Sequence, residues 1–170
     1  EPVSLVNGDG QDLCARTASV SITRTNDTNA YGAVDVIGAA TGSTAAIEFA
    51  NIGPNKGAVQ IVSTGLRVDA SALIASEAAY TLHLYSSTPP SALGDNTAWA
   101  LPSGDRGYYL GKLALGTPVD LGSTLWVEVN NIWKQVRLTG TSLFAYLTTD
   151  AGYTPTASRV YTVTLNVKPV

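Results

Sequence analysis

The stretch Ser19-Val20-Ser21-Ile22-Thr23-Arg24 alternates polar and apolar residues and then meets the turn-forming stretch Asn26-Asp27-Thr28-Asn29. Because the side chains of a β-strand point alternately to its two faces, this spacing predicts a strand with one face toward a core and the other toward water. Asn and Asp favour turns, so the strand is expected to end before residue 26. The same pattern recurs along the rest of the chain.

Further short runs rich in Val, Ile, Thr and Tyr lie between clusters of Gly, Pro, Asn and Asp. They occupy residues 34–37, 46–50, 59–63, 66–69, 80–85, 109–115, 125–129, 132–138, 143–148 and 160–167. Their spacing is close to the roughly 8–12 residues that is typical of sandwiches and barrels. No fixed sequence period links them, which disfavours a propeller or a solenoid. The sequence therefore predicts an all-β protein, a single antiparallel β-sandwich.

Two longer segments interrupt this pattern. Ala70 to Ala79 contains good helix formers but is short and lies between two strands, so a turn or a short helix is expected. Ser86 to Tyr108 contains many residues that break regular structure, namely Pro89, Pro90, Gly94, Pro102, Gly104 and Gly107. We expect it to form a long ordered loop, and loops of that length are usually functional or interfacial.

Length, composition and charge limit the number of domains and the classes of partner that the chain can have. A chain of 170 residues fits one domain, and 45% hydrophobic with 14% charged residues argue against disorder. We expect an extended N-terminal arm over residues 1–18 and the sandwich over residues 19–170. Ten basic and 13 acidic residues give a net charge of −3 without a basic stripe, so no nucleic-acid partner is predicted. No apolar run approaches the roughly 18 residues of a membrane span, so no membrane partner is expected.

The residues that carry chemistry are few. One Cys and one His exclude an internal disulfide and a structural zinc site. His83 shares a strand face with Thr81 and Tyr85, opposite Leu82 and Leu84, and no Gly-x-Ser-x-Gly motif accompanies it. The stretch from Asn7 to Asp12 resembles a calcium loop but lacks its closing Glu. We therefore predict no catalytic residue, no cofactor site and no metal site.

The most informative segment for binding runs from Thr124 to Leu138. If Asn130-Asn131 is a two-residue hairpin turn, one face carries Leu125, Val127, Val129, Ile132, Val136 and Leu138, and the other carries Trp126, Glu128, Trp133, Gln135 and Arg137. Lys134 then falls on the inward face and must reach an edge. Two tryptophans among polar neighbours resemble interface anchors, so Trp126, Glu128, Trp133, Gln135 and Arg137 form a candidate protein interface. The alternative is that another part of the chain covers both faces.

The long loop offers a second candidate surface. Trp99, Tyr108 and Tyr109 are candidate loop contacts, because aromatic rings can stack on sugars. Asp95 and Asp105 lie in the same loop, and paired acids are what a glycosidase requires. Both acids also fit ordinary turn chemistry, which is the stronger interpretation.

Several stretches are similar to a group of virion proteins that tailed bacteriophages and prophages encode among their structural genes. They are Leu82-His83-Leu84-Tyr85 with Pro89-Pro90, Leu93-Gly94-Asp95-Asn96-Thr97-Ala98-Trp99, Leu101-Pro102-Ser103-Gly104-Asp105-Arg106, Leu115-Gly116-Thr117-Pro118-Val119-Asp120-Leu121-Gly122-Ser123-Thr124-Leu125, and Phe144-Ala145-Tyr146-Leu147 with Gly152-Tyr153-Thr154-Pro155. The similarity extends from about Ser19 to the end of the chain. No motif of the group defines a functional residue.

The resemblance implies a capsid or tail component, and we favour the head-decoration, or cement, type. Proteins of that type are often β-sandwich or jelly-roll trimers on the outer surface of the phage head, so the resemblance implies that the sandwich is jelly-roll-like. The expected function is therefore non-enzymatic: the chain associates with itself as a homotrimer and binds the major capsid protein or another virion subunit. The alternative is a carbohydrate-binding or tail- or fibre-associated adhesion module that uses Trp99, Tyr108 and Tyr109. A hydrolase that uses Asp95 and Asp105 is the third hypothesis.

Overall fold

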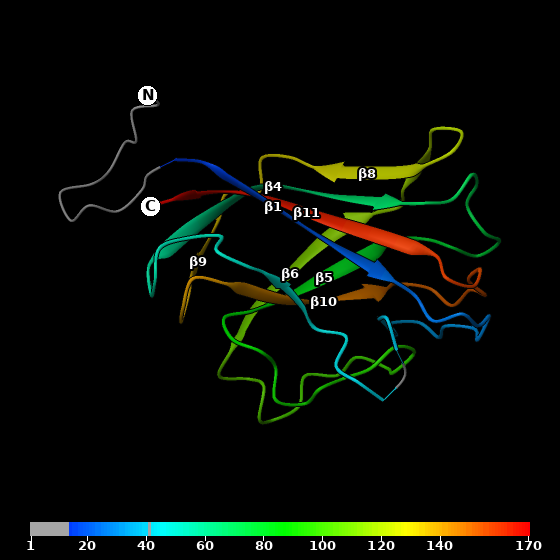
Figure 1. Cartoon of the computed structure of the whole chain (residues 1–170), viewed down its shortest axis with the longest axis horizontal. Coiled ribbons are helices and arrows are strands. Elements are labelled where there is room, and N and C mark those ends of the chain that lie inside the picture. Colours follow the sequence, from blue (N-terminus) through cyan, green and yellow to red (C-terminus); the bar gives the residue numbers. More distant parts are fainter. Residues whose placement is uncertain (1–13, 41) are drawn as a thin grey trace.

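A computed structural model of the chain describes residues 14–40 and 42–170 (Figure 1). The described residues form eleven β-strands and no helix. The strands are β1 (Arg16–Thr23), β2 (Val36–Ile37), β3 (Ile47–Phe49), β4 (Ala58–Val68), β5 (Tyr80–Tyr85), β6 (Tyr109–Gly116), β7 (Val119–Asp120), β8 (Leu125–Val129), β9 (Lys134–Arg137), β10 (Leu143–Thr149) and β11 (Val160–Pro169).

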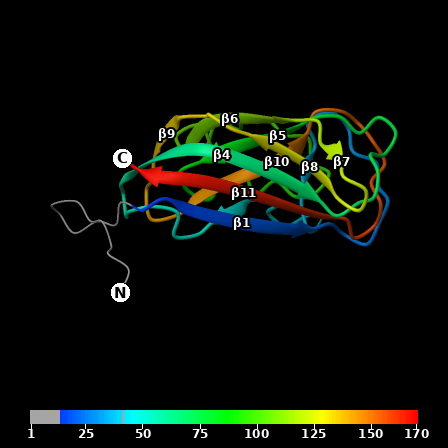
Figure 2. The same cartoon turned by 90° about the horizontal axis from the view of Figure 1, so that it is seen from above.

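The strands form two antiparallel sheets that pack face to face (Figure 2). The first sheet has the order β1-β11-β4-β8-β7, and β9 also pairs with β4. The second sheet has the order β2-β10-β5-β6, and β3 also pairs with β10. The chain alternates between the two sheets as it proceeds, so strands that are distant in sequence, such as β1 and β11, become neighbours.

The strand order is that of a jelly roll. β2 and β3 pair with successive parts of β10, and β8 and β9 with successive parts of β4, so each pair counts as one broken strand. With the short edge strand β7 left out, the eleven strands reduce to eight. In order along the chain these lie as first, eighth, third and sixth in one sheet, and second, seventh, fourth and fifth in the other. This is the arrangement of two interlocked Greek keys, which confirms the expected sandwich and its jelly-roll topology.

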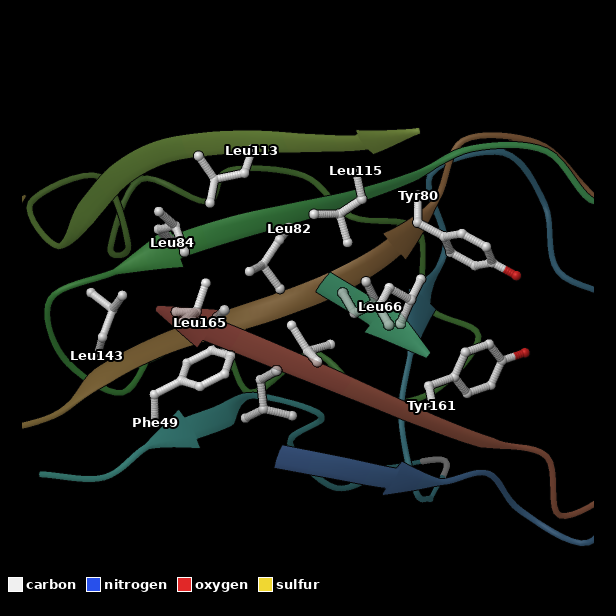
Figure 3. Close-up of a cluster of buried hydrophobic side chains, with 14 of the residues drawn as sticks. Phe49, Leu66, Tyr80, Leu82, Leu84, Leu113, Leu115, Leu143, Tyr161 and Leu165 are labelled. Carbon is white, nitrogen blue, oxygen red and sulfur yellow. The ribbon is translucent and has the colours of Figure 1, made fainter. Parts of the chain in front are cut away.

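The core lies between the sheets and follows from the alternation in the sequence. In β11, Tyr161, Val163 and Leu165 are buried, whereas the residues between them face outward. Leu66 and Leu165 of the first sheet face leucines of the second sheet (Figure 3). Burial of each such side chain contributes about 1.5–3 kcal/mol to folding.

Some boundaries differ from those expected. β1 begins at Arg16 rather than at Ser19, so residues 16–18 belong to the sheet, and residues 1–13 of the expected arm lie outside the described residues. β4 is one strand where two were predicted, because its pairing with β11 continues across a bulge at Val62, where the inward-facing positions shift from odd to even residues. The segment 70–79 forms turns without a helix, and 86–108 is a loop with a single bridge, Asp35 to Ala98.

One end of the sandwich is held by a buried polar network. Arg159 pairs with Glu77 at 3.0 and 2.9 Å, and the Tyr80 hydroxyl donates to the same carboxylate. The Tyr153 hydroxyl is 3.1 Å from that of Tyr80 and 2.8 Å from that of Tyr161. Burial raises the pKa of Tyr153 to about 12, so its hydroxyl keeps its proton. The network fixes the loop that precedes β5 to the start of β11.

Candidate protein interface

The outer face of the second sheet is covered by the chain's own long loop. The indole of Trp99 stacks on His83 of β5, with ring centroids 3.6 Å apart, and its Nε1 donates to the Tyr85 hydroxyl at 3.1 Å. Tyr85 and Tyr146 are fully buried there, in a second apolar cluster that is separate from the core between the sheets and against which Trp99 packs. The residues between 86 and 108 therefore act as a cover, and this face of the sandwich is closed.

This cover changes the interpretation of the loop aromatics. Tyr109 lies at the start of β6, and its hydroxyl is 3.2 Å from His83 Nδ1. Trp99 and Tyr109 are both half-buried against the sheet, so the rings expected to stack on sugars pack on the protein itself. Tyr108 alone of the three is exposed, at 39%. Burial, with a smaller contribution from the charge of Lys112, lowers the pKa of His83 to about 4.

The two acids of the loop are structural in their contacts. Asp95 and Asp105 are each 1% exposed. Asp95 accepts hydrogen bonds from the Tyr31 hydroxyl at 2.6 Å and from the Gly38 amide at 2.8 Å. Asp105 accepts from the amide and the hydroxyl of Ser91. Buried carboxylates that are satisfied in this way fix turns, as the turn chemistry of the sequence predicted.

The outer face of the first sheet, by contrast, is open over much of its area. On β1 and β11 it carries hydroxyls in register: Ser19 lies 2.8 Å from Thr164, and Ser21 lies 2.8 Å from Thr162. Each hydroxyl pair orders the side chains of two neighbouring strands. The resulting surface is polar on this side of the sheet.

The segment from Thr124 to Leu138, which the sequence predicts to be a hairpin, has a different arrangement in the structure. β8 pairs with Thr64 to Val68 of β4, and β9 pairs with Ala58 to Ile61 of the same strand. The two strands therefore follow one another along one edge of β4, and the predicted hairpin at Asn130-Asn131 is wrong. Residues 130–133 bulge out of the ladder, with Asn131 at φ 58° and Trp133 at φ 52°.

The predicted division into two faces nevertheless holds. Leu125, Val136 and Leu138 are buried, whereas the five candidate interface residues lie outward; they are Trp126, Glu128, Trp133, Gln135 and Arg137. Lys134 falls on the inward side and reaches the sheet edge as expected, because a Cβ on Gly111 of β6 would lie 3.1 Å from its Nζ. The structure thus brings the five candidates onto one face, along one interrupted strand.

The two tryptophans of this face differ in their surroundings. Trp133 is 51% exposed, and the Lys168 ammonium lies 5.2 Å from its ring centroid. Trp126 is half-buried and lies over Gly65, where an added Cβ would be 3.1 Å from its Cη2 atom. Val119, opposite Trp126 on β7, and Leu121 are more than 60% exposed. The sequence pattern missed this apolar edge, because β7 is only two residues long.

No protein-family model and no curated protein matches the chain. Among solved structures it is similar to the capsid of Ralstonia phage GP4, with 14% identity and a TM-score of 0.43 over 98% of this chain and 90% of that chain. It is also similar to Desmodium yellow mottle tymovirus, with 13% identity and a TM-score of 0.29 over 100% of this chain and 96% of that chain. For turnip yellow mosaic virus the identity is 11% and the TM-score 0.31, over 100% and 88% of the two chains. The jelly-roll assignment rests on the strand order and is independent of these likenesses.

The described residues form no helix of the length and apolar character that spanning a membrane requires. They also contain no cluster of three or more His, Cys, Asp or Glu side chains placed to hold a metal ion. The fold and the surface together define a jelly-roll domain with one closed face and one open face that carries two tryptophans.

Proposed function

We propose that this chain is a non-enzymatic structural protein of a tailed-phage virion, of the head-decoration type. It associates as a homotrimer and binds the outer surface of the head through the major capsid protein or another virion subunit. The observation that carries the proposal is the open face of the first sheet, where Trp126, Glu128, Trp133, Gln135 and Arg137 lie together. The resemblance of the stretches between residues 82 and 155 to phage virion proteins supports the same assignment.

Trp133 is the proposed anchor of this interface. A bulky residue in the left-handed region costs about 1–3 kcal/mol and persists only where the surrounding structure imposes it. Here the bulge after β8 imposes it and directs the indole into solvent. Trp and Arg are enriched among residues that dominate binding energy, and Arg137 lies on the same face. An exposed indole held at a backbone cost is a feature of binding rather than of folding.

The fold by itself does not choose between functions, because jelly rolls occur in viral capsid proteins, lectins and other classes. The alternative of an adhesion module that uses Trp99, Tyr108 and Tyr109 has weaker geometric support. Two of these rings pack on His83 and Tyr85, and only Tyr108 offers a free surface. Tyr108 is therefore the residue that separates the two proposals.

The test measures the mass of the protein in solution and its co-sedimentation with capsids that lack decoration. We expect a trimer and saturable binding. Trp133→Ala should weaken association by about 30-fold or more, since loss of an interface hot spot costs about 2 kcal/mol or more. Its fold should persist because the ring is half exposed.

The matched control is Tyr108→Ala, which removes an exposed aromatic ring from the end of the covering loop, outside the candidate interface. It should leave capsid binding unchanged. If Tyr108→Ala abolishes binding and Trp133→Ala does not, the loop is the interface and the proposal is wrong. The proposal is also wrong if the wild-type protein is strictly monomeric and does not bind undecorated capsids.

A further inference from the structure

A second feature of the open face is a cavity of about 260 Å³ at the end where β4 finishes. Arg67, Asp69, Thr124, Val160 and Thr162 line it. It lies just below the roughly 300–1,000 Å³ of pockets that hold drug-sized ligands, so its size suits one small ring. None of its lining residues belongs to the candidate interface described above.

The sheet register explains why these side chains converge. Arg67 pairs with Thr162 of β11 on one side and with Trp126 of β8 on the other. Asp69 lies two residues after Arg67 and therefore on the same face, and its amide donates to the Val160 carbonyl at 2.9 Å. Thr124 immediately precedes β8 and closes the third side. Residues in β4 and β11, or directly beside β4 and β8, thus supply the walls.

The charges of the cavity select the chemistry of its ligand. Within residues 14–40 and 42–170, the side chains of Arg67 and Asp69 form no ion pair and no hydrogen bond to protein, and Arg67 is exposed. An anion drawn to Arg67 meets the carboxylate of Asp69, and a cation drawn to Asp69 meets the guanidinium. A neutral hydroxyl satisfies both, because its oxygen accepts from Arg67 while its hydrogen is donated to Asp69. The Thr162 hydroxyl adds a further donor or acceptor.

Trp126 extends this surface beyond the cavity. Because Gly65 has no side chain, the indole lies close against the strand, with its Cη2 atom 3.1 Å from the position of a Cβ. Its half-buried ring offers an apolar surface beside Arg67. Sugar rings combine hydroxyls at their edges with apolar C–H faces, which fits a polar cavity followed by an indole.

We propose that this cavity and Trp126 bind a neutral oligosaccharide, with one sugar ring in the cavity and the next against the indole. The site is separate from Trp99, Tyr108 and Tyr109, and it does not depend on the virion function. Trp126 borders both this site and the protein interface, whereas Arg67 and Asp69 belong to the saccharide site alone.

The test is saturation-transfer NMR on the full chain. The probes are glucose, galactose and mannose as single sugars, and maltotriose, cellotriose, galactotriose and mannotriose as trisaccharides. We expect millimolar binding of at least one trisaccharide and of its constituent sugar. Arg67→Ala and Asp69→Asn should each weaken both about tenfold or more, the usual effect of losing a hydrogen bond to a charged group. Trp126→Ala should weaken the trisaccharide and spare the single sugar.

Arg137→Ala is the matched control, since it removes an arginine from the other end of the same face and should leave sugar binding unchanged. The proposal is overturned if no probe binds, or if binding survives the double variant Arg67→Ala/Asp69→Asn. If no probe binds and that variant also loses capsid binding, the cavity belongs to the protein interface instead. Loss of sugar binding with a retained trimer and retained capsid binding supports both proposals independently.

Discussion

At the scale of single residues, His83 shows how the closed face affects titration. Burial under Trp99 is the main reason that its pKa falls to about 4, and the nearby Lys112 adds to the effect. The unfolded chain has the ordinary value of 6.5 and binds the proton more readily. Stability should therefore be insensitive to this group above pH 6.5 and should fall as the pH drops from 6.5 through about 4. The loss reaches about 3 kcal/mol.

Urea unfolding at a series of pH values checks this expectation. The variant His83→Gln removes the titrating group, so its stability should depend less on pH between 4 and 6.5 than that of the wild type. Equal pH dependence in the two proteins would show that His83 is not held neutral by the covering loop.

Gly65 is the second residue whose identity the structure explains. A Cβ at this position meets the indole of Trp126, whereas at Gly104 it meets nothing within 4 Å. We expect Gly65→Ala to displace the indole and to cost about 1–3 kcal/mol, the usual range for overpacking. Gly104→Ala should be nearly neutral. In a Trp126→Ala background the cost of Gly65→Ala should largely vanish, which a double-mutant cycle measures; a cost that persists would place the clash elsewhere.

At the scale of elements, the broken strand formed by β8 and β9 separates what the sequence predicts from what it does not. Alternation of apolar and polar residues placed Trp126, Glu128 and Gln135 outward correctly, because burial sets that pattern locally. The partner strand depends on contacts that are distant in sequence, so a turn-like Asn130-Asn131 was mistaken for a hairpin. No local signal distinguishes a bulge from a two-residue turn there.

The bulge yields a prediction about strain. Trp133 has a φ of 52°, a region that costs a residue with a side chain roughly 1–2 kcal/mol more than it costs glycine. Trp133→Gly should therefore be more stable than Trp133→Ala by about 1 kcal/mol, in contrast to the usual order in regular strands. Chemical denaturation of the two variants measures the difference. Greater stability of the alanine variant would mean that the backbone at residue 133 is not held in this region.

The covering loop was predicted as a loop but not as a cover. The prolines and glycines of this loop indicate the absence of regular structure. They do not indicate that the loop packs on β5, where all six residues from Tyr80 to Tyr85 are buried. An aromatic residue at Tyr85, on the face opposite Leu82 and Leu84, was the available signal that both sides of this strand are covered. The aromatic rings of the loop were consequently assigned to a ligand rather than to the sheet.

At the scale of the whole molecule, the sandwich follows from the spacing of the strands, and the jelly-roll order required the long-range pairing of β1 with β11. The network around Glu77 and Arg159 has no local sequence signature, since its members lie in segments far apart in the chain. Arg159 is 2% exposed, and the carboxylate of Glu77 compensates its buried positive charge.

Glu77→Gln should therefore destabilise the fold by about 3–5 kcal/mol, because it leaves a buried arginine without its partner. The double variant Glu77→Gln/Arg159→Met should recover much of that loss by removing the unpaired charge. Thermal or chemical unfolding of the three proteins provides the measurement. If the double variant is no more stable than the single one, the ion pair is not what makes Glu77 necessary.

Because residues 86–108 cover the outer face of one sheet, the two broad sides of the molecule differ. If an extended partner binds the open face, as proposed, every copy meets it in the same orientation, because the loop is part of the chain itself. Tyr108, which is 39% exposed, belongs to the covering loop and not to the open face. A fluorophore or tag attached there should stay accessible at full occupancy, whatever the partner is.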